Sequence, residues 1–297
     1  MEEATITESP RPRLWRWILG TFIILITWFI VGAILSAVSA SLFGLDLIAL
    51  SGTDKESLAI VRGYEPWQAA SAVLISFLPL LLAPILLHRL LLRRPLRELF
   101  TRSRRSFHSD VLIGVMVMSF LLIVTGLPDF ILNNSGYTWS FDGGRFFPYL
   151  LVALTLIPIQ TTAEEVFYRG WIQRWLDNGK RSIWLVSLAN GALFALPHLA
   201  NPEVNGELFL AVVGYGATGF MFSWVTFRDR SMEIALGAHA ANNILAGLLV
   251  TSSDSALPSS SIWTTPAVVW GPAAIISVAI VPIFIWLTRK PADKVAA

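Results

Sequence analysis

Two adjacent glutamates and an arginine stand at the end of an apolar stretch in this sequence. Glu164, Glu165 and Arg169 follow the hydrophobic run from Phe147 to Thr162. Burying an ionised side chain in such apolar surroundings costs several kcal/mol of free energy unless the charge is paired, and an unpaired charge there is a candidate for a functional role. In a helix, Glu165 and Arg169 lie one turn apart and can form an ion pair. Glu164 is rotated by about 100° from Glu165, so it lacks a local partner and can point toward the centre of a bundle.

This cluster alone supports two interpretations. It can be a salt-bridged helix end at the membrane interface, or it can be part of a functional site. The pair of Glu165 and Arg169 explains two of the three charges and leaves Glu164 unexplained. Acids inside membrane segments are rare and mark functional sites by default, so both interpretations stay open at this point.

Two further polar pairs interrupt apolar segments. Phe194 and His198 are four residues apart, so the ring can pack beside the imidazole. His239 and Asn243 have the same spacing and can donate hydrogen bonds toward a common point, whereas Asn242 lies on another face. A lone histidine in an apolar helix is more often structural. Taken singly, the pair of His239 and Asn243 can also be a polar contact between helices.

The depths of these residues in their helices link the three clusters. The depth of each residue is measured from the expected cytoplasmic end of its helix, at 1.5 Å per residue. Glu164 lies roughly 18 Å from that end, His198 roughly 24 Å and His239 roughly 14 Å. These depths are compatible with one site. A glutamate, two histidines and an asparagine would supply a base, a partner that orients water and donors to an oxyanion, which are the parts that hydrolysis requires.

The composition predicts the elements that must position these residues. The chain has 297 residues, of which 55% are hydrophobic and 14% charged, and its mean hydropathy is +0.63. A soluble protein of this length cannot hide so much apolar surface. We therefore predict an all-α, polytopic integral membrane bundle that forms one membrane domain over residues 1–297. The absence of cysteine excludes disulfides and thiolate chemistry, and a net charge of +2 gives no indication of a nucleic-acid partner.

About eight segments approach the length of about 20 mostly apolar residues that a membrane-spanning helix needs. They are Trp15–Val38, Trp67–His88, Val111–Leu132, Phe147–Leu176, Ser182–Leu199, Leu208–Phe227, Met232–Val250 and Ala267–Leu287. The connection from Arg89 to Arg105 is rich in arginine, and short basic loops stay cytoplasmic. Every basic cluster falls on that side in this count, so both tails, 1–14 and 289–297, are expected to be cytoplasmic.

Two patterns invite other interpretations. Arg11, Arg13 and Arg16 precede an apolar run and a possible cleavage site, as in a signal peptide. The apolar run is longer than the hydrophobic region of a usual signal peptide, so we expect an uncleaved first membrane helix. The segment Gly214–Gly219 matches the G-x-G-x-x-G pattern of dinucleotide-binding proteins. It lies within an apolar helix, where small residues allow close helix packing.

With these residues in hand, the chain resembles the CPBP family of CAAX proteases and bacteriocin-processing enzymes, also called the Abi family. That family carries E-E-x-x-x-R, F-x-x-x-H and H-x-x-x-N on successive membrane helices. This sequence has Glu164-Glu165 with Arg169, then Phe194 with His198, then His239 with Asn243. The region 147–250 would be the catalytic core.

The resemblance implies an intramembrane endopeptidase related to the type II CAAX prenyl endopeptidases. Glu164 would be the general base for a water also held by His198, and His239 with Asn243 would stabilise the oxyanion. Glu165, Arg169 and Phe194 would support the site. We favour a mechanism without metal, because a Zn²⁺ bound by Glu164, His198 and His239 would leave too few groups for the base and oxyanion roles.

The expected surroundings are membrane lipid and a peptide or membrane-protein substrate, either prenylated or not. The layout suits a multi-pass protein of a prokaryotic plasma membrane. The competing hypothesis is a non-catalytic transporter or scaffold that uses the same buried polar residues as a proton relay. A relay needs no amide donor beside His239, so the role of Asn243 separates the two hypotheses.

Overall fold

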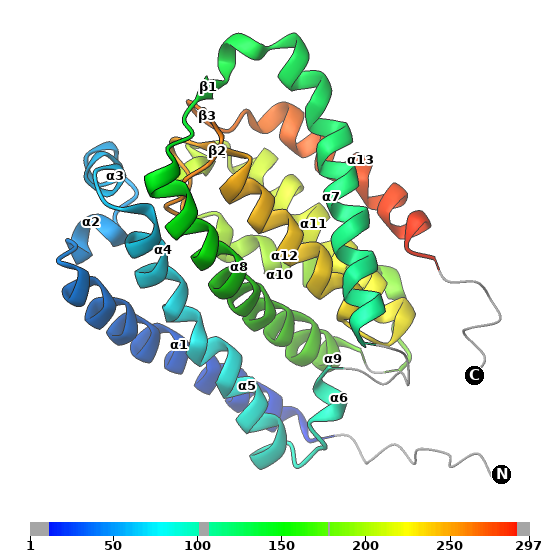
Figure 1. The fold of residues 1–297 in the computed structure, drawn as a ribbon. Coiled ribbons are helices and arrows are strands. Elements are labelled where there is room, and N and C mark those ends of the chain that lie inside the picture. Colours follow the sequence, from blue (N-terminus) through cyan, green and yellow to red (C-terminus); the bar gives the residue numbers. More distant parts are fainter. Residues whose placement is uncertain (1–11, 101–106, 178, 290–297) are drawn as a thin grey trace.

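The computed structural model describes residues 12–100, 107–177 and 179–289, and this part of the chain is a bundle of helices (Figure 1). The longer helices are α1 (Leu14–Phe43), α4 (Pro66–Leu74), α5 (Leu78–Leu90), α7 (Phe107–Leu132), α8 (Gly143–Glu165), α10 (Ile183–His198), α11 (Leu208–Asp229), α12 (Glu233–Leu248) and α13 (Trp270–Leu287). Short helices are α2 (Leu47–Ser51), α3 (Lys55–Arg62), α6 (Arg97–Phe100) and α9 (Gln173–Leu176). The polytopic helical fold class is confirmed.

The number of spans differs from the prediction. In the part of the chain that the structure describes, six helical stretches are long and apolar enough to cross a membrane, namely Leu14–Phe43, Pro66–Leu90, His108–Leu132, Gly143–Leu176, Leu208–Asp229 and Trp270–Leu287. The other two predicted segments are helical, but α10 and α12 have only 16 residues each. Most of α12 is buried against its neighbours, and a helix covered by protein does not need a continuous apolar surface toward lipid.

A proline explains the break in the second span. The helix stops after Leu74, tightens into a short turn and restarts at Leu78. Pro79 has no backbone N–H, and its ring would clash with the carbonyl of Ile75 in a regular helix. The polar segment before this span is also more ordered than a loop, because Asp46 and Asp54 cap α2 and α3 with side-chain hydrogen bonds to backbone N–H groups.

A small sheet joins three segments that lie between the predicted spans or at the end of one of them. Strands β1 (Thr138–Trp139), β2 (Val250–Ser252) and β3 (Trp263–Thr265) pair in the order β1-β3-β2. The β1–β3 pair is antiparallel and the β2–β3 pair is parallel. The strands lie together near the starts of α8 and α13 (Figure 1).

The glycine pattern in α11 serves helix packing, as predicted. A Cβ atom at Gly219 would lie 2.8 Å from the Cβ of Phe194 in α10, and one at Gly191 would lie 2.7 Å from the carbonyl oxygen of Gly216. Larger residues at these contacts would push α10 and α11 apart. This close approach brings Phe194 against α11, which matters for the site below.

Several of the described arginines gather at one end of the bundle, as the charge pattern predicts. A cavity of about 630 Å³ lies among the start of α1, the end of α9 and the turn between α11 and α12. Its cationic lining residues include Arg94, Arg174, Arg181 and Arg230. Arg102, Arg104 and Arg105 lie outside the described residues. The cytoplasmic orientation of this end, and of both tails, stays a prediction.

Candidate active site

The stretch from Glu164 to Arg169 spans a change in helix type. Regular α8 ends at Glu165, and Val166–Ile172 continues it as a π-helical segment into α9. Wider π turns are rare and occur often at functional sites. The side-chain amide of Asn190 in α10 donates a hydrogen bond of 2.8 Å to the carbonyl oxygen of Tyr168 in this segment. Nothing in the local sequence pattern had predicted the π segment or this contact.

Arg169 is buried and connects three parts of the site. Its Nη1 lies 3.0 Å from Oε1 of Glu165, so the predicted ion pair is present. Its Nη2 donates a hydrogen bond of 3.0 Å to the carbonyl oxygen of Gly219. The guanidinium carbon lies 4.8 Å from the centre of the Phe194 ring, within reach of a cation–π interaction. These contacts compensate the charge of Arg169 inside the bundle.

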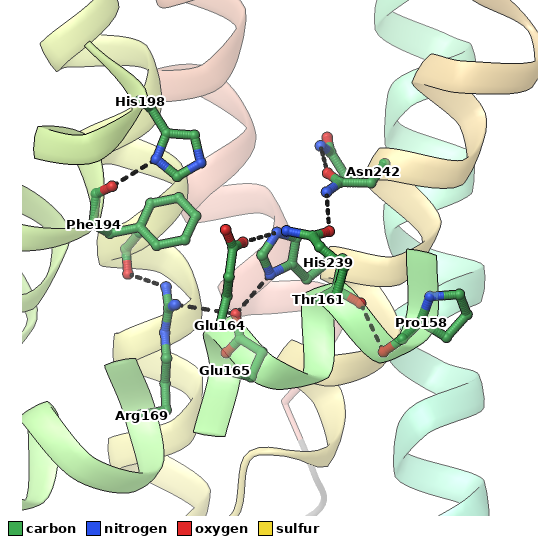
Figure 2. A network of polar contacts seen from close by, with 12 residues as sticks. Pro158, Thr161, Glu164, Glu165, Arg169, Phe194, His198, His239 and Asn242 are labelled. Atoms are coloured by element: carbon green, nitrogen blue, oxygen red, sulfur yellow. Dashed lines mark hydrogen bonds and ion pairs between the residues drawn. The ribbon is translucent and has the colours of Figure 1, made fainter. Parts of the chain in front are cut away.

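His239 joins the two glutamates (Figure 2). Its Nδ1 lies 2.8 Å from Oε1 of Glu165, and its Nε2 lies 3.3 Å from Oε2 of Glu164. The imidazole also stacks on Phe222, with ring centres 5.2 Å apart. Glu164 therefore has a partner on a later helix, as its lack of a local one suggested. The second role of Glu165, as an acceptor from His239, was missed because helical spacing shows only contacts within one helix.

The proton positions follow from the chemistry of these partners. A carboxylate paired with a guanidinium can only accept, so Nδ1 of His239 is the donor toward Glu165. The contact between Nε2 and Oε2 of Glu164 is longer, at 3.3 Å, and within the described residues this oxygen is buried and has no hydrogen-bond partner. It is therefore an acceptor that a further donor, such as a water molecule, would satisfy.

His198 stands apart from this chain of contacts. Its Nδ1 lies 2.7 Å from the carbonyl oxygen of Phe194, and a carbonyl only accepts, so Nδ1 carries a hydrogen and Nε2 has a free lone pair. Within the described residues, His198 has no hydrogen bond to Glu164. The Phe194 ring contacts both imidazoles, with centre distances of 4.6 Å to His198 and 5.7 Å to His239. Figure 2 shows the Glu164 side chain directed toward the side of the site where His198 and Asn242 lie.

Asn243 is oriented by two other amides. Its Nδ2 donates a long hydrogen bond of 3.3 Å to Oε1 of Gln160, and its Oδ1 accepts one of 3.0 Å from Nδ2 of Asn242. These bonds fix which end of the Asn243 amide is the donor, and they leave its second N–H hydrogen available. Gln160 was missed by the sequence reasoning. The signal that could have found it is its position one helical turn before Glu164 on the same face of α8.

Comparison with known proteins identifies the family of this chain. A family model described as type II CAAX prenyl endopeptidase, Rce1-like, matches residues 145–245. The uncharacterized protein YyaK of Bacillus subtilis (strain 168) is 32% identical over 212 residues, which cover 69% of this chain and 71% of the relative. The chain belongs to the Rce1-like family. No solved structure matches it.

The match to the Rce1-like family covers every motif of the site. Glu164, His198, His239 and Asn243 all lie within residues 145–245. The chain is therefore a membrane protein of a CAAX protease family, a family that works in lipid and acts on peptides. The wider core of 147–250 and the single domain of 1–297 stay predictions, as do the individual roles of the site residues.

The donor set of this Rce1-like site does not fit the zinc alternative. No group of three or more His, Cys, Asp or Glu side chains close enough to hold a metal ion occurs in residues 12–100, 107–177 and 179–289. Glu164 and His239 are in contact, but within the described residues His198 makes no hydrogen bond or ion pair with either of them. We therefore derive no step through a metal.

Proposed function

We propose that this Rce1-like protein is an intramembrane endopeptidase in which Glu164 is the general base. The observation that carries the proposal is the 3.3 Å contact between Oε2 of buried Glu164 and Nε2 of His239. Glu165, compensated by Arg169, holds the other nitrogen of the same ring. The imidazole is thus fixed at one end and directed at Glu164 by the other, which is the preorganisation that catalysis by proton transfer needs.

The first step would be the activation of a water molecule. The water binds between Glu164 and the free lone pair on Nε2 of His198. Glu164 accepts one proton from it while the oxygen attacks the carbonyl carbon of the peptide bond. The π bond electrons of that carbonyl move to its oxygen, which becomes an oxyanion.

Two groups would then donate to the oxyanion. His239 acts as an imidazolium in this step, so that Nδ1–H stays on Glu165 while Nε2–H donates to the oxyanion. Asn243 donates its second amide hydrogen, with its orientation kept by Gln160 and Asn242. When the C–N bond breaks, Glu164 gives its proton to the leaving amine and becomes a carboxylate again. Each oxyanion donor of this kind contributes about 10²- to 10³-fold to the rate.

We propose as substrates peptides or membrane proteins that bring a peptide bond into the bundle, with prenylated CAAX-type peptides as the first class to examine. The family description supports this class. The bacterial relative supports a prokaryotic plasma membrane as the location.

The experiment that tests the function compares three versions of the protein in cells and in purified form. Wild type, Glu164→Gln and Glu207→Gln are expressed at equal levels, and Glu207 is a matched control because it is an exposed carboxylate at the start of α11. We expect wild type and Glu207→Gln, but not Glu164→Gln, to produce new termini in the membrane proteome and to cleave a farnesylated CAAX peptide. Identical proteomes together with no cleaved peptide would contradict the proposal.

A further inference from the structure

His198 needs a support that its own helix does not supply. It is the last residue of α10, and the chain leaves the helix directly after it. Its one hydrogen bond, from Nδ1 to the Phe194 carbonyl, leaves the half-buried ring able to tilt about that bond. The proposed reaction requires Nε2 to be directed at a water molecule. A misplacement of about 1 Å in such a group can cost on the order of 100-fold in rate.

Tyr215 of α11 supplies that support. Its ring centre lies 4.6 Å from that of His198, at an interplanar angle of 34°, which nearly matches the contact of Phe194 with the same imidazole. His198 thus packs against one aromatic ring from its own helix and one from α11. Tyr215 lies inside the glycine pattern of α11, between Gly214 and Gly216, and the close packing of α10 and α11 keeps the two rings within contact.

Glu203 holds the far end of Tyr215. The tyrosine hydroxyl donates a hydrogen bond of 2.9 Å to Oε1 of Glu203, which also accepts one of 3.0 Å from Asn201. The other carboxylate oxygen accepts one of 2.8 Å from the backbone N–H of Ala256. The carbonyl oxygen of Glu203 accepts one of 2.7 Å from the indole of Trp270, which also contacts the Tyr215 ring.

These bonds tie Tyr215 to three other segments of the chain. They are the turn after α10, the connection between β2 and β3, and the start of α13. Both oxygens of the carboxylate and the phenol are in use, so the Tyr215 side chain cannot swing away about its Cα–Cβ bond without breaking hydrogen bonds. The turn that carries Glu203 begins only a few residues after His198. The anchor therefore lies close to the imidazole along the chain as well as in the fold.

We propose that Tyr215, held by Glu203, is a positioning residue that fixes the orientation of the His198 imidazole. The inference rests on the proposed function, because it assigns His198 a task in the reaction. Neither Tyr215 nor Glu203 belongs to the three motifs. Tyr215 acts through the imidazole and has no contact of its own with the reacting atoms.

The first test is kinetic and uses wild type, Tyr215→Phe, Tyr215→Leu and Tyr149→Phe in the same nanodiscs. Tyr149→Phe is the matched control, because it removes a buried tyrosine hydroxyl from a different core cluster. We expect kcat to fall about 100-fold in Tyr215→Leu with KM within about twofold. Tyr215→Phe keeps the ring but loses its hydrogen bond to Glu203, so its kcat should fall by less than that of Tyr215→Leu, whereas Tyr149→Phe should retain the wild-type kcat. Unchanged kcat in a folded Tyr215→Leu protein would overturn the proposal.

The second test reads His198 directly and needs no activity. The full-length protein is labelled with ¹⁵N-histidine, and the His198 signals are assigned by their loss in His198→Gln. Wild type should show one tautomer with the hydrogen on Nδ1. Glu203→Gln and Tyr215→Leu should shift these signals or average them with the other tautomer, whereas Tyr149→Phe should not. Unchanged signals in both variants would refute the positioning role. If wild type showed the expected signals but had no peptidase activity, the proposed function would be refuted and the positioning role of Tyr215 would stand.

Discussion

The ion pair between Glu165 and Arg169 gives a prediction about stability that follows from its burial. Both side chains are fully buried, and their closest N–O distance is 3.0 Å. Replacing one partner with glutamine leaves the other as an uncompensated charge inside the bundle. Breaking a buried pair in this way costs about 3–5 kcal/mol. We expect Glu165→Gln and Arg169→Gln each to lower the free energy of unfolding by that amount.

The double variant should be more stable than the sum of these losses implies. With both charges removed, no uncompensated ion remains, although His239 and the Gly219 carbonyl still lose a partner. The coupling free energy between Glu165 and Arg169 should therefore be about 1–3 kcal/mol, the range for residues within one polar network. This magnitude can be resolved by reversible unfolding of the protein in bicelles.

A second pair with the same spacing provides the control. Arg94 and Glu98 are also four residues apart, with a closest N–O distance of 2.7 Å, but their side chains retain 11% and 22% exposure. A partly hydrated pair should couple by less than about 1 kcal/mol. If Glu165 and Arg169 coupled no more strongly than this control pair, the burial argument for the site would be refuted.

Three further predictions follow from other contacts. Asn243→Ala should lower kcat by about 10²- to 10³-fold at unchanged stability; a proton-coupled uptake activity that survives this change while Glu164 stays essential would favour the relay hypothesis. Gly219→Ala should cost about 1–3 kcal/mol of unfolding free energy, because its Cβ would meet α10 at 2.8 Å, whereas Gly126→Ala should cost little because nothing lies within 4 Å of that position. Burial and the hydrogen bond to Asp129 raise the pKa of Tyr137 to about 12 from 10.0, so its contribution to stability is complete below pH 10 and should be lost as the pH rises toward 12. An alkaline titration of wild type and Tyr137→Phe measures this contribution, and equal loss of stability in both would contradict it.

The sequence predicted the contacts that lie within one helix. The pairing of Glu165 with Arg169 and the packing of Phe194 beside His198 both follow from a spacing of four residues. The helical class followed from hydropathy, because lipid allows few alternatives for an apolar chain.

Contacts between helices were harder to predict, because they depend on the rotation and depth of each helix. Hydropathy alone could not show that His239 reaches both glutamates or that Gln160 orients Asn243. The π segment after Glu165 changes the helical rotation there, which no spacing rule anticipates. The eight predicted spans include α10 and α12, which have only 16 residues each. Most of α12 is covered by protein, whereas Trp184, Leu185 and Leu188 of α10 are exposed.

The central claim is that the carboxylate of Glu164 activates the water that cleaves the peptide bond. Single-turnover cleavage of a prenylated peptide in H₂¹⁸O tests it most directly, with purified wild type, Glu164→Gln and Glu207→Gln in identical nanodiscs. We predict that wild type and Glu207→Gln place one ¹⁸O atom in the new carboxyl terminus at similar rates, and that folded Glu164→Gln forms no product above background. Cleavage by Glu164→Gln at a rate near that of wild type would contradict the mechanism.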